Sequence, residues 1–135
     1  MISKELLEEV LGERYIPKLV DWFEVFDNTL STYYDCGKYD EQGRPTGLGM
    51  EINIYELTHL CKEWAIRKEY QVSSGFGDEP AYRKANEKCY ARLMWKNEQH
   101  EESDMYFITE TEPEAVFAAC EWILKQERDT KNERD

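Results

Sequence analysis

The segment that decides the fold reads NIYELTHLCKEWA and runs from Asn53 to Ala65. Asn53 and Glu56 form an N-x-x-E capping pattern, and Ile52 with Leu57 supplies a hydrophobic staple at the same end. Apolar side chains then recur at helical spacing and share one face, namely Leu57, Leu60, Cys61, Trp64 and Ala65. The segment therefore predicts an amphipathic helix packed against a core.

Two further helices are predicted from the same kind of signal. At the start of the chain, Ser3 is the expected N-cap and Gly12 the expected stop of a short helix. Thr111 and Glu114 form a capping box for the last helix. Its apolar stripe consists of Ala115, Val116, Ala119, Cys120, Ile123 and Leu124. Every residue from Gln126 onward is polar or charged, which predicts a frayed tail over residues 126–135.

Between the first two helices, residues 18–36 are rich in β-branched and aromatic types on both sides of Asp27-Asn28. This pattern predicts a β-hairpin. The stretch from Gly37 to Gly49 holds four of the seven glycines and one proline. Because glycine and proline mark turns and loops, we expect a mobile loop there. It lacks the order of a phosphate-binding loop.

Three strands are predicted between the second and third helices. One begins at residues 70–72 and ends in the Ser-Ser-Gly-Phe-Gly run of residues 73–77, and a second covers residues 88–96. Residues 97–104 form a polar turn, and residues 105–109 return as a strand. Residues 79–87 fit a loop or a short helix. The order α-β-β-α-β-β-β-α predicts an α+β fold, an antiparallel sheet packed against helices, in one domain over residues 1–125.

Net charge is the most informative feature of the composition. The 135 residues include 29 acids and 17 bases, which gives a net charge of −12. Such a field repels nucleic-acid phosphates and anionic lipid, so we expect no direct binding to nucleic acid or membrane and an attraction for a basic protein partner. The charge also serves solubility, and that alternative stays open. No apolar run is long enough to span a membrane and no signal peptide is recognisable, so we expect a cytoplasmic protein.

Residues that carry chemistry are few and scattered. Glu56-x-x-His59 is half of a di-iron motif, but the chain has no second copy and only one other histidine, His100. The four cysteines show no metal-binding spacing and are expected to be buried free thiols. They are Cys36, Cys61, Cys89 and Cys120. We therefore predict no catalytic, cofactor-binding or metal-binding residue.

An interaction surface is the one candidate site. Acidic residues gather in the predicted turn after the 88–96 strand, where they can face a basic partner: Glu98, Glu101, Glu102 and Asp104. A solvated loop is the alternative. Large aromatic residues also exceed the needs of a small core, and the exposed ones are favoured interface anchors. They are Trp22, Phe23, Tyr33, Tyr34, Trp64, Trp95, Tyr106, Phe107 and Trp122.

Two segments together, residues 52–65 and 111–124, resemble small uncharacterised phage- or prophage-associated proteins of bacteria. The resemblance extends to residues 2–7 and covers about a third of the chain. Both long segments are helix caps followed by core stripes, so they define a fold rather than an active site. The resemblance implies a bacterial cytoplasm and a mobile-element setting, and it implies no activity.

The function favoured by these observations is that of a non-enzymatic acidic binding protein of phage or prophage type. A sharper version is an inhibitor that mimics nucleic acid and offers carboxylates to a basic host protein. The alternatives are a small enzyme that uses carboxylates assembled in the fold, and an oligomeric assembly component whose exposed aromatics pair subunits.

Overall fold

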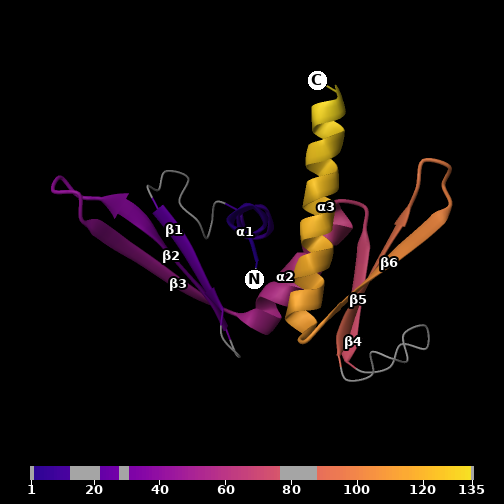
Figure 1. Cartoon of the computed structure of the whole chain (residues 1–135), viewed down its shortest axis with the longest axis horizontal. Coiled ribbons are helices and arrows are strands. Elements are labelled where there is room, and N and C mark those ends of the chain that lie inside the picture. Colours follow the sequence, from indigo (N-terminus) through magenta and orange to yellow (C-terminus); the bar gives the residue numbers. More distant parts are fainter. Residues whose placement is uncertain (1, 13–21, 28–30, 77–87, 135) are drawn as a thin grey trace. The chain divides into compact units, whose positions relative to one another are not determined.

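The computed structural model describes residues 2–12, 22–27, 31–76 and 88–134 and contains helices and antiparallel strands (Figure 1). In chain order the elements are α1 (Lys4–Leu11), β1 (Trp22–Asp27), β2 (Ser31–Tyr39), β3 (Pro45–Asn53), α2 (Ile54–Arg67), β4 (Gln71–Phe76), β5 (Cys89–Lys96), β6 (Glu102–Thr109) and α3 (Glu112–Arg134). The α+β fold class is confirmed. The chain divides into two compact units, residues 1–60 and 61–135, each described here by itself. A single domain over residues 1–125 stays a prediction.

Each helix begins where its cap was predicted. The side-chain oxygens of Ser3, Asn53 and Thr111 accept the backbone N–H three residues on, at 3.1, 3.3 and 3.3 Å. These bonds satisfy donors that a helix start otherwise leaves unpaired. α1 ends at Gly12, whose φ is 69°, as predicted. α3 continues past Gln126, where the charged tail begins, and runs to Arg134.

The first unit contains a three-stranded antiparallel sheet in the order β1-β2-β3. The predicted loop over residues 37–49 is wrong, because β2 and β3 pair from Ser31↔Asn53 to Tyr39↔Pro45. Only a tight turn separates them. Pro45 is tolerated because it is the first residue of an edge strand, where a missing N–H costs little. Glycine and proline disfavour strands in general, but they are compatible with pairing in an edge hairpin.

The second unit repeats this plan with a sheet in the order β4-β5-β6. β4 runs through Ser73 to Phe76, where the sequence predicted its end. Gly75 is part of the ladder and pairs with Tyr90, whose ring lies so close that a Cβ at Gly75 would be 2.9 Å from it. β6 begins at Glu102, so the predicted turn over residues 97–104 is too long. Residues 79–87 lie outside the described residues.

The core of the second unit lies between α3 and one face of this sheet (Figure 1). Alternate residues of β5 are buried, namely Cys89, Ala91 and Leu93, and Val72 of β4 pairs with Leu93 on the same face. The predicted stripe of α3 is buried along its whole length: Ala115, Val116, Ala119, Cys120, Ile123 and Leu124. The apolar face of the helix and the apolar face of the sheet therefore pack together in one layer.

The two β-hairpins that join β2 to β3 and β5 to β6 close with the same turn. Asp40 Oδ1 accepts the backbone N–H of residues 42 and 44 at 2.9 Å, and Asn97 Oδ1 accepts those of residues 99 and 101 at 3.0 Å. The fourth residue of each turn has positive φ: Gly43 at 77° and His100 at 62°. Hydrogen bonding from the backbone of Arg44 lowers the pKa of Asp40. The turns differ in that one uses glycine and the other uses histidine.

Candidate binding site

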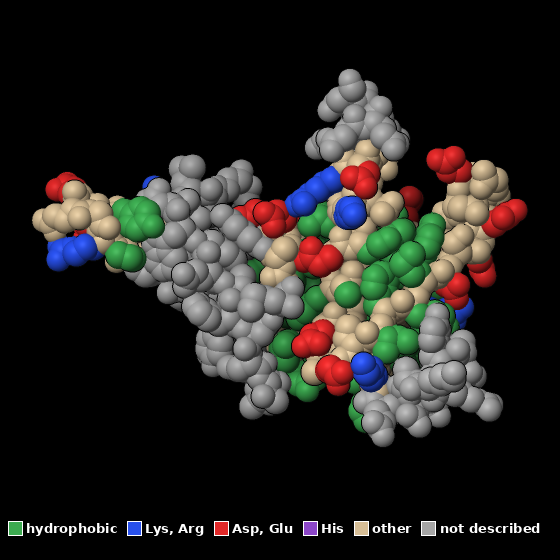
Figure 2. All heavy atoms as spheres, in the orientation of Figure 1, with side chains coloured by type: hydrophobic (Ala, Val, Ile, Leu, Met, Phe, Trp, Pro, Cys, Tyr) green, Lys and Arg blue, Asp and Glu red, His purple; other side chains and the backbone are tan. Residues whose placement is uncertain are grey.

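The four predicted interaction residues lie around the turn between β5 and β6, and all four are exposed. Glu98 and Glu101 are in the turn itself, whereas Glu102 and Asp104 are on β6 and not in a loop. Figure 2 shows acidic side chains along the outer end of this hairpin. Whether they form an interaction surface stays a prediction, but the structure brings three of them to one hollow. Glu101 does not line it.

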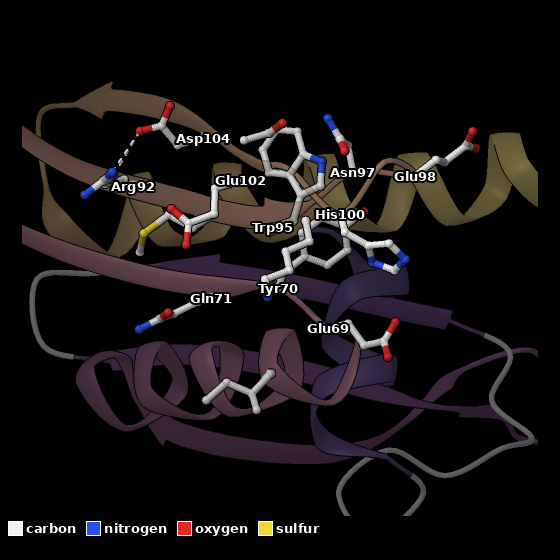
Figure 3. Close-up of a pocket in the computed structure, with 14 residues that line it drawn as sticks. Glu69, Tyr70, Gln71, Arg92, Trp95, Asn97, Glu98, His100, Glu102 and Asp104 are labelled. Carbon is white, nitrogen blue, oxygen red and sulfur yellow. Dashed lines mark hydrogen bonds and ion pairs between the residues drawn. The ribbon is translucent and has the colours of Figure 1, made fainter.

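The hollow has a volume of about 1050 Å³ and lies within the second unit (Figure 3). We refer to it as the β5–β6 hollow. Three parts of the unit line it: the end of α2 with the start of β4, the second half of β5, and the turn with the start of β6. The lining residues are Ile66, Glu69, Tyr70, Gln71, Arg92, Met94, Trp95, Lys96, Asn97, Glu98, His100, Glu102, Ser103 and Asp104.

Aromatic rings form the centre of the β5–β6 hollow. Trp95 packs on Trp122 of α3 with ring centroids 5.2 Å apart, and Tyr70 lies 6.0 Å from Trp95 and 6.2 Å from Trp122. These separations are in the range of favourable ring pairs, so α3 holds Tyr70 and Trp95 in place. Both rings are only half-buried. In Figure 3 the His100 ring lies beside them. The hollow thus offers fixed and accessible ring surface.

Carboxylates also line the hollow. In Figure 3, Glu69 and Glu98 lie on one side of the rings and Glu102 lies on the other. Asp104 is already occupied, since it accepts from Nε and Nη2 of Arg92 at 3.1 and 3.0 Å. Within the described part of the chain, no hydrogen bond or ion pair engages the other three carboxylates. The hollow therefore keeps an acidic excess that a bound cation would neutralise.

Two residues that line the hollow have an unusual backbone. Glu69 (φ 69°) and His100 (φ 62°) are the non-glycine residues with positive φ among those that the structure describes. Glu69 ends α2 in a Schellman motif, since the N–H of Tyr70 bonds to the carbonyl of Ala65 at 2.9 Å. Glycine is the usual residue at such a position. Strained residues of this kind are concentrated at functional sites.

Sequence reasoning did not find Glu69, Tyr70 or His100 as site residues. A signal existed for one of them. The turn sequences DEQGR (residues 40–44) and NEQHE (residues 97–101) share Glu-Gln at their second and third positions, and the second turn has histidine where the first has glycine. The contribution of Glu69 depends on where α2 ends relative to the hairpin, which is a tertiary property.

Glycine at these two positions is expected to favour the fold and weaken the site. For His100→Gly and Glu69→Gly we expect each free energy of unfolding to stay unchanged or rise by about 1 kcal/mol, because relief of strain exceeds the entropic cost of glycine. Urea unfolding measures this. Alanine at the same positions is the control and should destabilise, since it keeps the strain and loses the side chain. A loss of stability for glycine as large as that for alanine would contradict this account.

Nucleophilic chemistry finds no support at the cysteines that the structure describes. Cys61, Cys89 and Cys120 are buried free thiols, as predicted. A side-chain hydrogen bond with Cys120, and then burial, raises the pKa of Cys61 well above its ordinary value. Burial raises the pKa of Cys89. Both thiols are therefore protonated at neutral pH, and a protonated thiol is a poor nucleophile.

Metal binding and membrane insertion find no support in the described residues either. No group of three or more His, Cys, Asp or Glu side chains in that part of the chain is arranged to hold a metal ion, and His59 is exposed on α2. No helix among the described elements is long and apolar enough to cross a membrane. The groups that the β5–β6 hollow presents are aromatic rings and carboxylates, and both kinds of group favour cations.

No protein-family model, curated protein or solved structure matches this chain.

Proposed function

We propose that this chain is a non-enzymatic acidic binding protein that recognises a basic segment of a protein partner through the β5–β6 hollow. The observation that carries the proposal is the composition of the hollow, in which aromatic rings held by α3 share the lining with the exposed carboxylates of Glu69, Glu98 and Glu102. Aromatic faces and carboxylates both favour cations. The net charge of −12 would attract a basic partner from a distance.

The carboxylates and the backbone strain at the hollow fit a role in binding better than a role in stabilising the fold. Three exposed carboxylates line one hollow, and two backbone positions carry strain. Neither feature stabilises the fold. A protein that needed acids only for solubility would have no reason to place them beside half-buried rings. A cationic ligand would be attracted by these carboxylates.

A more specific version is an inhibitor that mimics nucleic acid, of the phage or prophage type that the capped helices resemble. In it, the carboxylates of the β5–β6 hairpin occupy sites where a basic protein holds phosphates. The exposed Glu98, Glu101, Glu102 and Asp104 support it by following one edge of the second unit. Competition with DNA for the basic partner separates this version from binding of a basic segment in general.

The direct test maps the binding site by NMR. An Arg-Gly-Ser repeat peptide is titrated into the ¹⁵N-labelled chain at low salt, and the shifts of backbone amides and the tryptophan indoles are followed. We expect the largest changes at the Trp95 indole and at residues 97–102, with weaker binding as salt is added. Changes absent at low salt, or confined to the first unit, would overturn the proposal.

The duplicated turn provides a matched pair of substitutions. Glu98 and Glu41 are the second residues of equivalent turns, and both are exposed. We expect Glu98→Gln to weaken binding of the peptide about two- to fivefold, the usual strength of one exposed charge pair. Glu41→Gln changes the net charge equally and should leave the affinity unchanged. Equal effects of the two substitutions would show that only net charge matters.

A further inference from the structure

The β5–β6 hollow has a shape and chemistry that discriminate between the two basic side chains. A lysine ammonium is a compact charge with no flat surface, whereas an arginine guanidinium is planar, stacks on aromatic rings and donates in a fork to carboxylates. The ring surface of Tyr70 and Trp95 is presented together with carboxylates from three segments, namely the connection between α2 and β4, the turn between β5 and β6, and β6 itself. A hollow that selected charge alone would have no use for the rings.

The same sheet already contains a bound guanidinium. Arg92 of β5 lies over the ring of Tyr106, with 5.8 Å from its Cζ to the ring centroid, and donates to Asp104 at 3.0 and 3.1 Å. Tyr106 is directly opposite Arg92 on β6, and Asp104 lies two residues before Tyr106 on the same face. This arrangement satisfies both the flat face and the N–H edge of the guanidinium.

The hollow offers the same two kinds of group a second time. Tyr70 and Trp95 correspond to the ring, and Glu98 with Glu69 to the carboxylate. Packing of Trp95 on Trp122 fixes the ring before any ligand arrives, which lowers the ordering cost of binding. Lys96 is the remaining cation of the lining, and its flexible ammonium cannot stack as a guanidinium does.

We infer that the β5–β6 hollow is a guanidinium subsite, filled by an arginine side chain in an exposed basic segment of the partner protein. This inference rests on the proposed function and specifies its ligand. The Trp95 ring of β5 stacks on the guanidinium plane, and Tyr70 lies beside it. The carboxylates of the turn and of the α2 terminus accept from its edge.

The test compares three peptides of identical length: the Arg-Gly-Ser repeat, its lysine analogue and its neutral citrulline analogue. Calorimetry at fixed salt gives the three affinities. We expect arginine to bind about threefold or more tightly than lysine, because stacking adds to charge. Citrulline, which keeps the flat group and loses the charge, should not bind measurably.

Substitution at Trp95 identifies the origin of any preference for arginine. Trp95→Leu should reduce the arginine-to-lysine ratio to about one, and Trp95→Phe should retain most of it, because a ring is kept. Tyr55, an exposed aromatic residue that does not line the hollow, provides the control Tyr55→Leu, which should leave the ratio unchanged. Melting curves of each variant establish that the fold is kept.

The outcomes separate this inference from the function that it specifies. Arginine and lysine peptides that bind equally would overturn the guanidinium subsite and leave recognition of a basic segment standing. A preference for arginine that survives Trp95→Leu would also overturn it. If neither cationic peptide binds at low salt, or if citrulline binds as well as arginine, both the subsite and the proposed function fail.

Discussion

Leu93→Ala is expected to lower the free energy of unfolding of the second unit by about 2–5 kcal/mol, the usual cost of truncating a buried leucine. Leu93 is completely buried in the middle of β5, between its partners Val72 on β4 and Met105 on β6. Its side chain is on the sheet face that α3 covers. A cavity there removes contacts from the centre of the apolar layer.

Met94→Ala is the matched control for that substitution. Met94 is the next residue of the same strand, and the strand period places it on the opposite face, where it is half-buried and lines the hollow. Both changes put alanine in the same strand, so the effect of β-propensity is shared. We expect Met94→Ala to cost about 1 kcal/mol or less. Urea unfolding followed by tryptophan fluorescence gives both values, and equal losses would contradict the assignment of the two faces.

Much of the fold was predictable because its signals are local. The three caps at Ser3, Asn53 and Thr111 depend on residues within one helical turn, and all three are confirmed. The alternation of residues 89–96 also predicted a strand correctly. Such patterns need no knowledge of the rest of the chain.

The wrong prediction of a loop in place of β3 had a different cause. β3 contains glycines and begins with Pro45, so its composition is that of a loop. What makes it a strand is its pairing with β2, where Gly47 lies opposite Gly37. A hairpin of this kind depends on the Asp40 turn, which fixes the register of both strands. The tendency to form strands here therefore depends on the pairing of β2 with β3 and is weak in the sequence of either segment alone.

The candidate site was predictable only in part. Acid enrichment indicated Glu98, Glu102 and Asp104, which line the hollow, but it also indicated Glu101, which does not. Composition records how many carboxylates a segment has and not which face they share. Glu102 is on β6 because the turn ends at residue 101, three residues earlier than predicted.

Charge reversal at the hollow is the second large effect that we expect. In the double variant Glu69→Lys with Glu98→Lys, two attractions become two repulsions, and the affinity for the Arg-Gly-Ser peptide should fall about tenfold or more. Glu102 is left unchanged because Lys96 lies directly opposite it across the ladder, and two lysines there would repel one another. The fold should therefore tolerate the double variant, which a melting curve checks.

The most direct test of the account measures the affinity of that peptide for three proteins: the unchanged chain, the Glu69→Lys, Glu98→Lys variant, and a Glu9→Lys, Glu41→Lys variant. Glu9 and Glu41 are exposed acids that do not line the hollow, so both variants have the same net charge. The account predicts that only the first variant loses about tenfold or more in affinity. Equal losses in the two variants, or no loss in either, would contradict a binding site at the β5–β6 hollow.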